Sequence, residues 1–99
     1  MKLWLISQNV NCGWDTYDSA VVAADTEEEA RNIYPSGNYE NCYDAVAWSG
    51  SKWLWHLADG RVLDYNDYSW TTPNHVLVKF LADGYDGPAG TVLASFNAG

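Results

Sequence analysis

The sequence predicts an α+β domain in which a small antiparallel sheet carries one short helix on a face. Short runs of β-branched, aromatic and aliphatic residues recur along the chain and are separated by turn residues, as in sheets of short strands. One segment, which follows Thr26, carries the signals of a helix start. The 99 residues suffice for one small domain, and we expect residues 1–99 to form a single one.

The N-terminal third is predicted to begin with a hairpin. Lys2–Val10 opens with four apolar residues and is predicted to be a strand. Ser19–Ala24 is predicted to be a buried strand that returns antiparallel to it, because the short connection suits a hairpin better than a crossover. The connecting residues, Asn9–Tyr17, include Asn, Gly and Asp and are typical of a loop.

The single helix is predicted from its first turn. Thr26 and Glu29 have the spacing of a capping box, and three consecutive glutamates place negative charge at the positive end of the helix dipole. Pro35 disfavours a helical conformation in the residue before it, so we expect the helix to span Glu27–Tyr34, about two turns. We interpret the acidic turn as a solvated cap.

The middle of the chain is rich in aromatic residues and is predicted to contain a Trp-rich hairpin. Its candidate strands are Asp44–Trp48, Lys52–Leu57 and Arg61–Tyr65. Alternation places Trp53 and Trp55 on one face of the second strand and His56 on the other. Val76–Leu81 and Thr91–Phe96 are predicted as the last two strands. The order of the strands in the sheet does not follow from the pattern.

The charge balance disfavours direct binding of nucleic acid. The chain has 13 Asp and Glu against 5 Lys and Arg, a formal charge of −8, whereas phosphate contacts need clustered cations. Its apolar runs are far below the ~20 residues of a membrane span, and the N-terminus has no signal-peptide pattern. We therefore expect a cytoplasmic protein with no membrane partner, in which Cys12 and Cys42 are reduced thiols.

The sequence contains no clear catalytic, cofactor or metal motif, so we expect a protein that is not an enzyme and holds no cofactor. The run from Asp64 to Asp67 resembles the start of a calcium loop, but Ser69 stands where the turn needs glycine and His75 where the bidentate glutamate belongs. A third, enzymatic hypothesis requires His56 to act with Asp59 or Asp64.

The chain has more large aromatic residues than its small core is expected to bury. Six Trp and seven Tyr are more large rings than a domain of this size readily buries, and Trp and Tyr carry binding energy at interfaces. The candidate binding residues are Trp14, Tyr17, Trp53, Trp55, Arg61, Tyr65 and Trp70. The alternative is that many of these rings cover the sheet as a secondary core, and for Trp53 and Trp55 both readings stay open.

Three stretches resemble a group of small uncharacterised proteins encoded by phages and prophages: KLWLISQ (residues 2–8), DTYDSAVVAADTEEEAR (15–31) and ASFNAG (94–99). The resemblance covers the first third of the chain and its last residues, and the Trp-rich middle has no counterpart. It assigns no functional residue. It implies a setting, the infected host cell, in which small accessory proteins often act by binding and disabling a host component.

These observations favour a non-enzymatic counter-defence protein that inhibits a host defence protein by binding it through an acidic, aromatic-rich surface. The charge supports this hypothesis, because complementary potentials steer encounter and select partners. The alternative is an oligomeric sponge that sequesters a cyclic nucleotide or a cyclic ADP-ribose-type immune signal between stacked rings. The aromatic content supports the sponge, and the shortage of cations argues against it.

Overall fold

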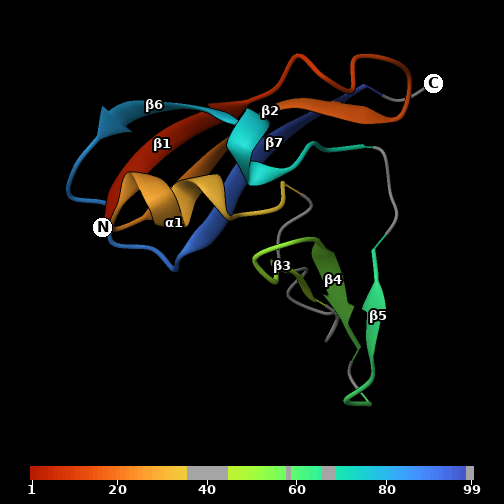
Figure 1. Cartoon of the computed structure of the whole chain (residues 1–99). Coiled ribbons are helices and arrows are strands. Elements are labelled where there is room, and N and C mark those ends of the chain that lie inside the picture. Colours follow the sequence, from red (N-terminus) through yellow and green to blue (C-terminus); the bar gives the residue numbers. More distant parts are fainter. Residues whose placement is uncertain (36–44, 58, 66–68, 98–99) are drawn as a thin grey trace.

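The computed structural model describes residues 1–35, 45–57, 59–65 and 69–97. Antiparallel strands dominate this part of the chain, and with them are one short α-helix and one 3-10 turn. The strands lie in two sheets where the sequence predicted one, so the architecture is mainly β with a small helical component (Figure 1). Cys42 and the first residue of the predicted strand Asp44–Trp48 lie outside the described residues.

The larger sheet has the strand order β6-β1-β2-β7. Its strands are β1 (Lys2–Ser7), β2 (Thr16–Ala24), β6 (Leu77–Ala82) and β7 (Gly90–Asn97). The predicted β1–β2 hairpin is confirmed, with Leu5 opposite Val21. β2 starts at Thr16 and not at Ser19, because the pairing with β7 extends to Thr16 and Tyr17 past an irregularity in the register.

Helix α1 (Glu27–Arg31) begins as predicted and ends earlier. The Thr26 hydroxyl accepts a hydrogen bond from the Glu29 N–H, which confirms the cap. The expected extension to Tyr34 is wrong, because the chain leaves the helix at Asn32 and Ile33 pairs with Ala47 of the second sheet. Sheet pairing thus replaces the second helical turn.

The smaller sheet contains the predicted Trp-rich hairpin. Its strands are β3 (Ala45–Trp48), β4 (Trp53–His56) and β5 (Val62–Asp64), in that order. Trp48 lies opposite Trp53 at the end of the β3–β4 pair. Gly50 and Gly60, in the two connections, have φ of 104° and 91°, a left-handed conformation that glycine adopts without strain.

One core joins the two sheets and the helix. Ile6 and Val22 of the larger sheet, Ala30 of α1 and Trp53 of the smaller sheet belong to one buried cluster. Figure 1 shows α1 and the smaller sheet on the same side of the larger sheet. On the opposite face, Leu93 of β7 lies beside Val21 and is 69% exposed.

Tyr34 lies where the two sheets meet. Its ring makes edge contacts with Trp53, Tyr65 and Tyr17, with centroid distances of 5.1, 5.2 and 6.3 Å. Its hydroxyl is 2.6 Å from the Ser69 hydroxyl, so its polar end is satisfied while its ring is buried. A large part of the aromatic excess is therefore used to join the two sheets.

Candidate binding site

The structure separates the candidate binding residues by exposure. Trp53 and Trp70 are buried in the core, whereas Tyr17, Trp55 and Tyr65 are half-buried against it or against each other. Trp14 and Arg61 are exposed, Trp14 to 79%. Only the last two offer most of their side chain to a partner.

Trp53 is held as a core residue. Its indole N–H donates to the Thr71 carbonyl at 3.0 Å, and its ring contacts Tyr34 and Trp48 edge-on. Trp70 is equally enclosed, although its indole nitrogen has no hydrogen-bond partner among the described residues. Of the alternatives left open by the sequence, Trp53 is core, and Trp55 packs at the rim against Tyr65 with centroids 6.2 Å apart.

In the described part of the Trp-rich hairpin, His56 is not joined to the carboxylates named with it. Arg61 pairs with Asp59 at 2.7 Å, and Lys52 pairs with Asp64 at 2.9 Å. His56 is exposed on β4 and forms an ion pair with neither carboxylate among the described residues. Of the residues named for the enzymatic hypothesis, Asp59 and Asp64 are therefore engaged in surface ion pairs.

A hollow of about 420 Å³ lies beside Trp14, at the turn between β1 and β2. We call it the Trp14 hollow; its described lining residues are Gln8, Asn11, Cys12, Gly13, Trp14, Thr16 and Asp18. The hollow is thus built mostly from the loop that the sequence placed between the first two strands. Cys12 is a free, exposed thiol in its wall.

Local hydrogen bonds fix the loop that carries Trp14. The Thr16 hydroxyl donates to the Gly13 carbonyl at 2.8 Å, and the Gly13 N–H donates back to the same hydroxyl at 3.3 Å. Between them Asp15 has φ of 60°, a left-handed conformation that costs free energy for a residue with a Cβ but that Asp tolerates better than most. The loop is closed on itself, and the Trp14 ring remains in solvent.

Gln8 forms the buried part of the wall. Its side-chain N–H group donates to the Tyr17 carbonyl at 2.7 Å and to the Ser69 carbonyl at 3.0 Å. Both amide hydrogens are used, which fixes the amide orientation. The residue is only 8% exposed, and its Oε1 is fully enclosed with no hydrogen-bond partner among the described residues.

The rim of the hollow is acidic. The Asp18 carboxylate is exposed and accepts a hydrogen bond from the Ser19 hydroxyl at 3.3 Å. Among the described lining residues none is a Lys, Arg or His. The hollow therefore combines an exposed aromatic ring and a carboxylate, with no positive charge from its described lining residues.

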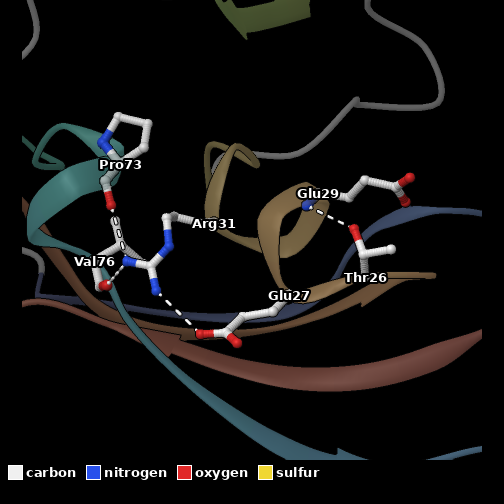
Figure 2. A network of polar contacts seen from close by, with 6 residues as sticks. All are labelled: Thr26, Glu27, Glu29, Arg31, Pro73 and Val76. Carbon is white, nitrogen blue, oxygen red and sulfur yellow. Dashed lines mark hydrogen bonds and ion pairs between the residues drawn. The ribbon is translucent and has the colours of Figure 1, made fainter.

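A second hollow, of about 500 Å³, lies between α1 and the 3-10 turn η1 (Pro73–His75). Arg31 is in its wall but is already engaged, as Figure 2 shows. Its guanidinium donates to the carbonyls of Pro73 and Val76 at 3.2 and 2.6 Å and pairs with Glu27 at 3.2 Å. Arg31 thus connects α1 to η1 and has little capacity left for a ligand.

The described part of the chain contains no cluster of His, Cys, Asp and Glu that could hold a metal ion. None of its helices is long and apolar enough to cross a membrane.

Comparisons with protein-family models, curated proteins and solved structures find no match. The Trp14 hollow, with its exposed ring, is therefore the candidate binding site.

Proposed function

We propose that this chain is a non-enzymatic binding protein that counters host defence during phage infection by binding a defence protein through the Trp14 hollow. The observation that carries the proposal is a tryptophan 79% exposed beside a hollow with an acidic rim. An exposed ring on a fixed loop supplies a large contact area at little cost in side-chain entropy. The phage setting rests on the resemblance of residues 2–8, 15–31 and 94–99.

Charge supports a basic partner. The chain has a formal charge of −8, so its potential attracts a positively charged surface and speeds encounter with it. Proteins that handle nucleic acid carry such basic surfaces. A blocking protein of this charge would cover a basic surface of that kind.

A pull-down from lysate of the bacterial host tests the proposal. At low salt the wild-type chain and Leu93→Ala should capture the same defence protein, whereas Trp14→Ala should lose it. Leu93 is a matched control because it is a large exposed apolar residue of β7 and is not among the described lining residues of the Trp14 hollow. Plating of phage on a host that carries the defence should follow the same order among the three variants. Capture of no partner, or capture that persists as salt is raised, contradicts the electrostatic binding function.

The sponge remains a second candidate because the aromatic ring of Trp48 lines the 500 Å³ hollow, and a nucleotide base stacks on such a ring. Arg31 is in the same wall, but its guanidinium is already engaged by Pro73, Val76 and Glu27. Thermal-shift screening against cyclic nucleotides and cyclic ADP-ribose isomers tests it, because a bound ligand must raise the unfolding temperature. The absence of any shift contradicts the sponge and leaves the protein-binding function.

A further inference from the structure

The described lining of the Trp14 hollow offers an exposed aromatic ring and a carboxylate but no Lys, Arg or His. Trp14 is 79% exposed, and Asp18 is exposed at the rim. An aromatic ring and a carboxylate both attract a positive charge. Gln8 Oε1 is fully enclosed, so it is not part of the surface that a ligand meets.

A phosphate or carboxylate ligand would add negative charge beside Asp18 and would meet no Lys, Arg or His among the described lining residues. The described lining therefore favours a ligand group that carries a positive charge and hydrogen-bond donors.

We propose that the Trp14 hollow binds the guanidinium group of an arginine side chain on the partner protein. The inference rests on the proposed function and names the group that the site recognises. Guanidinium is planar, carries five N–H donors and no acceptor, stacks on aromatic rings and pairs with carboxylates. In the hollow it stacks on Trp14 and pairs with Asp18.

The hollow is large enough to admit an arginine side chain. Its volume of about 420 Å³ lies within the roughly 300–1,000 Å³ that pockets for small ligands occupy. A lysine ammonium also carries charge, but it is a compact point charge that neither stacks as a plane nor bridges two acceptors in a fixed fork. We therefore expect a preference for arginine over lysine.

Nuclear magnetic resonance titration of the ¹⁵N-labelled chain tests this proposal without the partner. The probes are three blocked tripeptides, acetyl-Gly-X-Gly-amide, in which X is arginine, lysine or citrulline, the neutral analogue of arginine. The arginine peptide should shift the backbone amide signals of residues 11–18 with saturation in the millimolar range. The lysine peptide should bind more weakly, and the citrulline peptide should cause no saturable shift.

Three variants test which residues bind the arginine peptide. Trp14→Ala should weaken binding of the arginine peptide about 3-fold or more, the range of an exposed cation–π contact. Asp18→Asn should weaken it about 2- to 5-fold, as for an exposed ion pair. Asp86→Asn removes the same charge from another exposed loop position and should change the affinity little.

Two results overturn the inference. One is a citrulline peptide that binds as well as the arginine peptide, and the other is an arginine peptide whose affinity is unchanged in Trp14→Ala. Failure of this titration while the pull-down still depends on Trp14 would reject the guanidinium and retain the binding function. A positive titration with no captured protein would reject the proposed function and retain the site.

Discussion

Trp53 is 6% exposed and Trp14 is 79% exposed. Truncating Trp53 therefore removes core packing, whereas truncating Trp14 removes a ring that lies in solvent. The Trp53 ring is packed between Tyr34 and Trp48, and its N–H is bound to the Thr71 carbonyl. The structure gives Trp14 no ring contact or hydrogen bond of its indole within the described residues. One tryptophan stabilises the fold, and the other is available for binding.

We predict that Trp53→Ala lowers the free energy of unfolding by about 3–5 kcal/mol, since it leaves a large cavity and an unpaired carbonyl in the core. Trp14→Ala should change it by no more than about 0.5 kcal/mol, as for most surface substitutions. Urea unfolding followed by circular dichroism measures both values. Equal losses in the two variants would show that the Trp14 loop is part of the core.

The sequence names Trp14 as a candidate but cannot separate it from the buried tryptophans. The burial of Trp53 depends on Thr71, and the orientation of Gln8 depends on Ser69, 61 residues further along the chain. Such contacts leave no local pattern. Gln8 was therefore missed as a site residue, and the one signal that could have pointed to it is its place at the end of the first strand, beside the loop that carries Trp14.

Helix α1 is too short to be stable alone, and its contacts with η1 hold it in place. Arg31 donates to two carbonyls of the segment 73–76, which are far from α1 in sequence (Figure 2). The ion pair of Arg31 with Glu27 is on the exposed side, where Glu27 is largely in solvent. The two kinds of contact should differ in their contribution to stability.

We predict that Arg31→Met lowers the free energy of unfolding by about 1–3 kcal/mol, because two partly buried carbonyls lose a charged donor while the apolar stem is kept. Glu27→Gln should lower it by no more than about 0.5 kcal/mol, the usual value of an exposed helical pair. Unfolding in guanidinium chloride measures the loss of stability in each of the two variants. A larger effect of Glu27→Gln would mean that the exposed ion pair holds the helix.

The start of the helix and the hairpins can be predicted from the sequence because their signals are local. Thr26 and Glu29 are three residues apart, and each hairpin is joined by a short connection with its own turn residues. The end of the helix is not predictable in this way, because Ile33 leaves it to pair with Ala47. The division into two sheets likewise depends on which strands pair, and alternation alone does not specify that.

The whole molecule carries a formal charge of −8, and its scattered cations are largely engaged: Arg31, Lys52 and Arg61 each pair with a carboxylate. A negative potential of this size acts on a partner before contact is made. Its effect on binding should therefore be greatest on the rate of association.

We predict that the association rate with the captured partner falls steeply as ionic strength rises from low salt to about 0.15 M, where the Debye length is about 8 Å. The dissociation rate should change much less, because the contacts made by Trp14 are not long-range. Surface plasmon resonance at several salt concentrations separates the two rates. An association rate that does not depend on salt would remove the role assigned to the net charge.

In the proposed function, Trp14 carries binding while other residues hold the fold. Isothermal titration calorimetry of the captured partner against the wild-type chain, Trp14→Ala and Leu93→Ala measures the contribution of Trp14 to the affinity. Trp14→Ala should bind about 30-fold or more weakly, which is about 2 kcal/mol for an aromatic anchor, with its unfolding unchanged and with Leu93→Ala binding as the wild type does. Wild-type affinity in a folded Trp14→Ala variant would show that Trp14 does not carry binding.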